Sequence, residues 1–329
     1  MTEIQIRTIL AAVADPSSSR QPAIDRAAQL ATALQARLIL FHAAADPALS
    51  GRPFFDSRRL ARARGWLLAE RMRSLEKRAS ALRKRGLRVD VTAVWEEPAH
   101  EAIIRGVLRE QADLVIAGRH EPRGDGQAPF RLTDWELMRL CPRPLIVTTG
   151  ASGARATGAV IAALDPTHAR DKPASLDVSI AGYAAAIADA LNVECHAVHC
   201  MSRGAYPLGS EAAERRRIDQ RMRASMERVL KRADLQMASV RVLHGDVPDA
   251  LSEFARQLPA QILAMGIISR RWLKRFIVGD TAETVIRRAP CDLLLIKPDN
   301  FKLRLGRAHK EPVELPRAVA ALKARGRAA

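Results

Sequence analysis

The feature that most constrains the fold of this chain is an internal repeat with a period of about 150 residues, a usual size for one domain. The matched pairs are Asp15 with Asp165, His42 with His199, Pro98 with Pro248, Gly118 with Gly266, Thr133 with Thr281, and Pro142 with Pro290. From Gly118 and Gly266 onward the two copies stay in register without a gap. Because the landmarks recur in the same order, we interpret the chain as one module written twice.

Each copy alternates short apolar runs with segments of helical pattern. In the first copy we expect strands at 8–13, 37–42, 87–95, 113–117 and 144–149, and helices at 21–34, 58–85, 99–111 and 133–139. In the second copy we expect strands at 159–164, 193–199, 238–243, 261–265 and 292–297, and helices at 176–191, 210–233, 248–257 and 281–288. Continuously apolar strands joined by helices indicate parallel sheets covered on both faces. The sequence therefore predicts an α/β protein of two tandem, doubly wound, five-stranded domains over 1–150 and 157–300, followed by a basic tail over 301–329.

The charge balance is strongly basic, with 53 Lys and Arg against 36 Asp and Glu. Much of the excess lies in the predicted helix 57–85 and in the tail, so weak binding of a polyanion through these two segments is one hypothesis. We favour a solvated helix face, because no series of aromatic side chains alternates with the charges as in a nucleic-acid site. No specific nucleic-acid partner is expected.

The segment 263–298 has the layout of a ligand site. An apolar strand ends on Gly266, a loop follows, and a helix begins at Asp280 and Thr281. Backbone N–H groups of such a loop and helix start can approach a phosphate. In doubly wound sheets, ligands bind at the carboxyl ends of neighbouring strands. If the strands ending near Asp165 and Gly266 are neighbours, the Asp165 carboxylate can accept from a ribose or an adenine amino group. An Asp before Pro that caps a turn is the other interpretation, and both stay open.

The repeat, the strand that ends on Asp and the Gly–loop–Gly–helix pattern together resemble the tandem universal stress proteins. The segments GDTAETVIRRAPCDLLLIKPDNF and PVEL resemble the two-domain branch of that family, over nearly the whole chain. The resemblance implies a nucleotide-binding α/β fold of the HUP type and a role in surviving growth arrest, oxidative stress or DNA damage. It also implies that domains pair through their last strands, here 144–149 and 292–297, as an intramolecular pseudo-dimer.

The family's nucleotide motif, carried over, falls on Gly266, Ser269, Gly279 and Asp280, with Thr281 next. Ser269 replaces a glycine, and Asp280 replaces a hydroxyl residue at a helix start, where it suits the helix dipole and competes with a phosphate. Four basic residues in the intervening loop can offset that charge. The resemblance therefore implies a partly retained site for ATP or AMP with Mg²⁺ in the second domain.

The first copy lacks most of this motif. Gly118 is kept, but Glu121, Arg131 and Leu132 stand where the second copy has Ser269, Gly279 and Asp280. Glu121 would repel a phosphate, and Leu132 removes the helix cap. We expect this copy to bind no nucleotide and to serve as a structural partner of the second.

No catalytic or metal motif is present in the sequence. P-loop, GxGxxG, HExxH and GxSxG patterns are all missing, and His196 and His199 are expected on opposite faces of a strand. We therefore expect a non-catalytic protein without a metal site, although weak ATPase activity is left open. A scaffold that takes another small ligand or a protein partner in its crevices is the alternative, and a homodimer is left open. Four scattered cysteines and the lack of a signal or long apolar run predict a cytoplasmic protein without a membrane partner.

Overall fold

The computed structural model describes residues 4–45, 49, 57–118, 132–149, 158–167, 173, 175–207, 209–267, 280–303, 305–306 and 313–314. The first half contains β1 (Thr8–Ala12), α1 (Pro22–Ala33), β2 (Arg37–Ala44), α2 (Ser57–Lys84), β3 (Val89–Trp95), α3 (Ala99–Arg109), β4 (Leu114–Gly118), α4 (Leu132–Leu140) and β5 (Leu145–Thr148). The second half contains β6 (Ala159–Ala163), α5 (Ser175–Leu191), β7 (Glu194–Met201), η2 (Arg203–Ala205), α6 (Ala212–Ala233), β8 (Ser239–His244), α7 (Val247–Gln257), β9 (Ile262–Gly266), α8 (Asp280–Arg288) and β10 (Asp292–Ile296). A short strand, β11 (Val313–Glu314), follows. Apart from η2 and β11, each bound lies within two residues of its predicted position.

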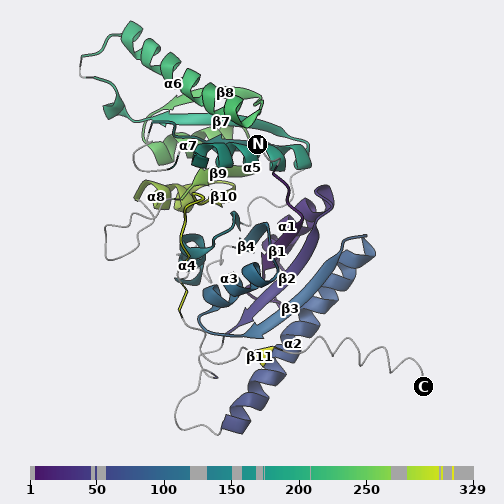
Figure 1. Ribbon diagram of the computed structural model, residues 1–329. Coiled ribbons are helices and arrows are strands. Elements are labelled where there is room, and N and C mark those ends of the chain that lie inside the picture. The colour runs from purple at the N-terminus through teal and green to yellow at the C-terminus, as the bar shows by residue number, and fades with distance from the viewer. Residues whose placement is uncertain are drawn as a thin grey trace.

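All strands belong to one sheet, in the order β11-β3-β2-β1-β4-β5-β10-β9-β6-β7-β8. Each half repeats the same order of five strands, parallel within the half, which confirms the predicted doubly wound fold. Two helix layers cover the sheet, and the two halves stand one above the other in Figure 1. Among the described residues, no helix is long and apolar enough to cross a bilayer.

Alternate residues of each strand enter different cores. In β1, Ile9 packs into the core under α1, α2, α5 and α6, whereas Leu10 packs into the core under α3, α4, α7 and α8. Leu38 and Ile39 of β2 divide in the same way. Because side chains of a strand alternate in direction, a strand buried on both faces must be apolar throughout. Both cores contain residues from both halves, so they run across the junction.

The two halves meet at their last strands. β5 and β10 are antiparallel, with Ile146 paired to Leu294 at the centre of the junction. A second contact lies on one face of the sheet, where Ile4 of the N-terminal segment packs on α5. A Cβ added at Gly182 would lie 2.6 Å from Ile4 Cδ1, so a larger residue there would require the Ile4 side chain to move.

A buried ion pair also crosses the junction. Arg26 of α1 donates from Nε to Asp292 Oδ2 at the start of β10, at 2.8 Å, and both side chains are 3% exposed. Arg26 Nη1 donates to Gln261 Oε1 at 3.0 Å and to Gln29 Oε1 at 2.7 Å. The backbone N–H of Thr149 donates to Asp292 Oδ1 at 3.0 Å. The position in the first half that matches Asp292 is a proline, so this network is not duplicated.

The described residues of the C-terminal segment pack on the first half. Leu303 and Leu305 extend the core under α3, and Arg105 of α3 donates to the carbonyl oxygen of Gly306 at 2.9 Å. β11 then pairs antiparallel with β3 and occupies its free edge (Figure 1). The sequence predicted only a basic tail over 301–329, whereas part of this segment forms a strand of the sheet.

Candidate functional site

The structure brings together the two strand ends that were expected to form a crevice. β6 and β9 are neighbours, with Ala162 paired to Ala264. Asp165 follows β6 by two residues, and Gly266 is the last residue of β9, so both lie at the same edge of the sheet. Helix α8 begins at Asp280, followed by an exposed Thr281. The other two predicted positions, Ser269 and Gly279, lie outside the described residues, as does the loop between them.

Asp165 lies in a turn with its carboxylate partly exposed. Thr167 Oγ1 donates to Asp165 Oδ1 at 2.8 Å, and the side chain is 37% exposed. Its backbone N–H donates to the buried Asp177 Oδ1 at 3.0 Å, which ties the first turn of α5 to the end of β6. An ionised carboxylate has about four acceptor positions. Thr167 Oγ1 fills one of these positions on Asp165, and His199 Nδ1 lies 3.8 Å from the same oxygen.

A buried histidine supports the strand end in each half. His199 Nδ1 lies 2.9 Å from the Leu164 carbonyl oxygen, and His42 Nδ1 lies 2.7 Å from the Val13 carbonyl oxygen. Burial lowers the pKa of His42, and the positive charge of Arg71 lowers it further. The hydrogen bond to Val13 raises the pKa but does not outweigh these effects, so the ring is neutral at pH 7. A neutral ring with Nδ1–H donating to a carbonyl is a structural group that fixes the turn.

His196 lies on the other side of β7 from His199. Its Nδ1 is 2.8 Å from Ser239 Oγ, and its Nε2 is 3.1 Å from Glu194 Oε2. The predicted opposite placement of the two histidines is therefore confirmed. Within the described ranges, no group of three His, Cys, Asp or Glu side chains is arranged to hold a metal ion.

Close packing explains why position 266 is a glycine, which the sequence alone did not indicate. A Cβ at this position would lie 2.9 Å from Leu176 Cδ2 and 3.2 Å from Ile180 Cδ1, because α5 crosses close over the end of β9. At the matching Gly118, a Cβ would meet its nearest neighbour, Ala23 Cβ, at an ordinary 3.7 Å. The glycine at the end of β9 therefore allows α5 to pack closely over the strand, independently of any ligand of the following loop.

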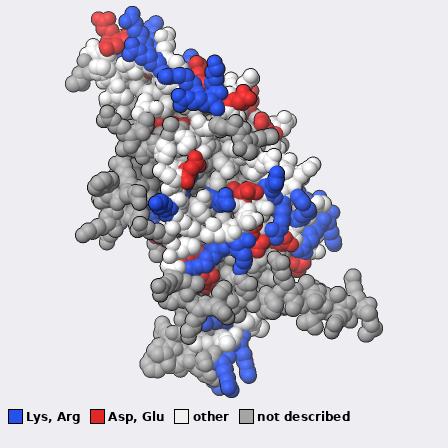
Figure 2. Space-filling view, in the orientation of Figure 1, with Lys and Arg blue, Asp and Glu red and all other residues white. Residues whose placement is uncertain are grey.

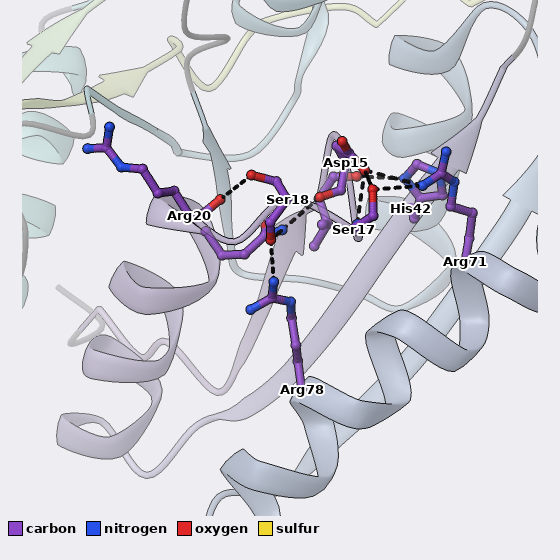
Figure 3. Close-up of polar contacts among 9 residues, drawn as sticks. Asp15, Ser17, Ser18, Arg20, His42, Arg71 and Arg78 are labelled. Carbon is purple, nitrogen blue, oxygen red and sulfur yellow. Dashed lines mark hydrogen bonds and ion pairs between the residues drawn. The ribbon is translucent and has the colours of Figure 1, made fainter.

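The turn after β1 in the first half is held by its own side chains (Figure 3). Asp15 Oδ1 accepts from the Ser17 backbone at 2.9 Å, from Ser17 Oγ at 2.5 Å and from Arg71 Nη1 at 3.2 Å. Burial raises the pKa of the Asp15 carboxyl, but the bonds from Ser17 and the charge of Arg71 outweigh it, so the pKa lies below its ordinary value. Arg78 donates to the Ser18 carbonyl oxygen. The acceptor that corresponds to Asp165 is thus engaged within the chain.

Sequence reasoning missed a polar cluster at the carboxyl end of β8. Asp219 of α6 accepts from Tyr206 OH at 2.5 Å, and its other oxygen lies 2.9 Å from His244 Nε2. The rings of Tyr206 and His244 stack with centroids 6.0 Å apart. Burial and the bond to Asp219 raise the pKa of Tyr206, so it stays a donor. The position of His244 at a strand end was the only available signal, since Asp219 is distant in the sequence.

The fold defines a class of two-domain α/β proteins with doubly wound halves joined at their last strands. The sequence profile of the universal stress protein family matches residues 5–149 and 171–297, one match in each half. The chain therefore belongs to the universal stress protein family.

Relatives and solved structures agree with this assignment. Universal stress protein E of Escherichia coli K12 and that of Salmonella typhi are each 26% identical over 306 residues, covering 88% of this chain and 94% of the relative. A putative universal stress protein from Pseudomonas aeruginosa has a TM-score of 0.68 at 24% identity, covering 90% of this chain and 94% of its own. One from Archaeoglobus fulgidus has a TM-score of 0.61 at 15% identity, covering 88% and 98%. The structural likenesses show the shared fold.

Proposed function

We propose that this chain is a non-catalytic stress-response protein whose second half binds an adenine nucleotide, ATP or AMP with Mg²⁺, while the first half is its structural partner. The layout of the second half carries the proposal, because the neighbouring strands β6 and β9 place Asp165 and Gly266 at one edge of the sheet. Both strand-end carboxylates reach the surface, Asp165 with 37% and Asp15 with 55% of the side chain exposed, and Asp15 is paired with Arg71. The family's nucleotide motif is also better retained in the second half than in the first.

The position of α8 supports a phosphate subsite on the same side. The helix N-terminus directs unpaired backbone N–H groups toward its start, where they favour a negative charge. Asp280 stands at that start, so Mg²⁺ bound with the nucleotide would offset the charge that this carboxylate adds. Absence of nucleotide binding would instead favour the alternative function, a scaffold whose crevices take a different ligand or a partner protein.

Isothermal titration with Mg-ATP of matched variants tests the proposal. Asp165→Ala removes a charged acceptor, worth about 1.5 kcal/mol or more, so we expect the affinity to fall about tenfold or more. Asp15→Ala is the matched control in the other half and should leave the affinity within about twofold, since a twofold change is far below the energy of one charged hydrogen bond. Equal losses in both variants, or no binding by the wild type, would contradict the proposal. Thermal unfolding of each variant separates loss of binding from loss of fold.

A further inference from the structure

Helix α2 carries three rows of side chains with different environments. The buried row consists of Leu68, Leu75, Ala79 and Leu82, which pack under the first half of the sheet. No described residue before Leu68 in this helix is buried. The N-terminal part of α2 therefore extends past the sheet, as the lower end of the helix shows in Figure 1.

A second row consists of Arg64, Arg71 and Arg78, spaced seven residues apart, and each has a partner within the first half. Arg64 donates to the Leu49 carbonyl oxygen and lies over the Trp95 ring, 5.1 Å from its centroid. Arg71 and Arg78 hold the turn after β1, as described above. This row fixes α2 against the sheet and is not available to another molecule.

The third row faces solvent along the whole helix. Its exposed members are Arg59, Arg62, Trp66, Arg73, Lys77 and Lys84, here called the α2 stripe. At about 100° per residue these positions fall within about 60° of one another, and they span about 38 Å of helix. Among the described residues, none of the five cations forms an ion pair. One carboxylate, the half-buried Glu70, lies on the same side and leaves the stripe strongly positive.

Trp66 is the unusual member of the stripe. It is 65% exposed, and within the described residues only one other large apolar side chain, Leu108, is exposed. A flat aromatic ring between cations offers a surface for a base, while the cations neutralise phosphates. The sequence suggested a merely solvated face because no series of aromatic residues was evident. The structure places this single ring on the charged face rather than in the core.

We propose that the α2 stripe binds single-stranded nucleic acid without sequence preference, with the backbone along the cations and one base stacked on Trp66. Figure 2 shows Lys and Arg at the lower end of the molecule, where α2 begins, and again along the right side, where it ends. A duplex hides the base faces that Trp66 would stack on, so the stripe favours unpaired strands. A membrane surface fits less well, because binding there requires a row of apolar side chains and the stripe has one. The proposal is independent of nucleotide binding in the second half.

The pseudo-symmetry of the chain supplies a matched control. Helix α6 is also long and rich in arginine, with exposed Arg216 and Arg223 spaced seven residues apart, but it contains no aromatic residue. Arg62→Glu with Arg73→Glu on α2 and Arg216→Glu with Arg223→Glu on α6 change the net charge equally. If binding were due only to the overall positive charge, the two double variants would lose it equally.

The test is fluorescence anisotropy with a labelled oligouridylate of about 20 nucleotides, longer than the usual site of about 4–16, at several salt concentrations. We expect Trp66→Ala to weaken binding about fivefold or more at an unchanged salt slope, because stacking on one aromatic ring contributes at least that factor. The α2 double variant should lower the salt slope by about 1.4, because each phosphate contact of a single strand contributes about 0.7 and two contacts are lost. The α6 double variant should bind with an affinity within about twofold of wild type.

Three results would overturn the proposal. These are wild-type affinity in Trp66→Ala, equal losses in the α2 and α6 double variants, and a duplex of the same length that binds as tightly as the single strand. Binding of anionic phospholipid vesicles with the same dependence on Trp66, in place of the oligouridylate, would assign the stripe to a membrane surface instead. Because Trp66 is exposed, its replacement should leave the melting temperature unchanged, which the same samples can show.

Discussion

The Arg26–Asp292 ion pair predicts how strongly the two halves stabilise each other. Both side chains are 3% exposed, and their partners come from opposite halves of the chain. Asp292→Ala would leave the Arg26 guanidinium buried without its carboxylate and would also orphan the Thr149 backbone N–H. Breaking a buried ion pair by removing one partner costs about 3–5 kcal/mol. We expect this loss in the free energy of unfolding for Asp292→Ala and a similar one for Arg26→Ala.

Replacing both partners should behave differently. Arg26→Met with Asp292→Leu removes both charges and fills the space, and such replacements of buried pairs are commonly neutral or stabilising. Urea unfolding at pH 7, followed by circular dichroism, would measure all three variants. The double variant should be more stable than either single variant. Single losses below about 1 kcal/mol, the usual value of an exposed pair, would refute it.

Two further predictions concern stability. Burial lowers the pKa of Lys297 to about 8. Its Nζ donates to the Met138 carbonyl oxygen at 2.6 Å. In the unfolded chain the pKa of this lysine is about 10.4, so between about pH 8 and 10 the unfolded state binds the proton more tightly than the folded state. The free energy of unfolding of the wild type should therefore rise with pH over this range, by up to about 3 kcal/mol relative to Lys297→Met. A pH-independent difference in urea unfolding would contradict this. Gly266→Ala should lose about 1–3 kcal/mol by overpacking against Leu176, whereas Gly118→Ala should lose less. Thermal unfolding that ranks the two glycines in reverse would disprove the packing argument.

The strands and helices could be predicted largely from the sequence, because their signals are local, whereas the order of strands in the sheet comes from the structure. Leu10 and Ile39 lie in continuously apolar runs, and a strand buried on both faces leaves that pattern. The repeat then predicted the same succession of strands and helices along the chain in each half. β11 could not be predicted, because two residues carry too weak a pattern and their pairing with β3 depends on tertiary structure.

The candidate site was predicted only in part, for a similar reason. Asp165 and Gly266 were identified because each ends an apolar run, and the structure places their strands side by side. The ion pair between Asp15 and Arg71 could not be predicted, because a helix distant in the sequence brings Arg71 to Asp15. The exposure of Trp66 could not be predicted, because the exposure of a single residue on an amphipathic helix depends on how that helix packs.

Native mass spectrometry of the protein purified without added nucleotide, and then titrated with Mg-ATP, tests the central claim most directly. The asymmetry between the halves predicts one nucleotide per chain in the wild type and in Asp15→Ala, and none in Gly279→Arg, which alters the motif of the second half alone. Two nucleotides per chain would contradict the structural role of the first half. No nucleotide at millimolar ATP would contradict nucleotide binding itself.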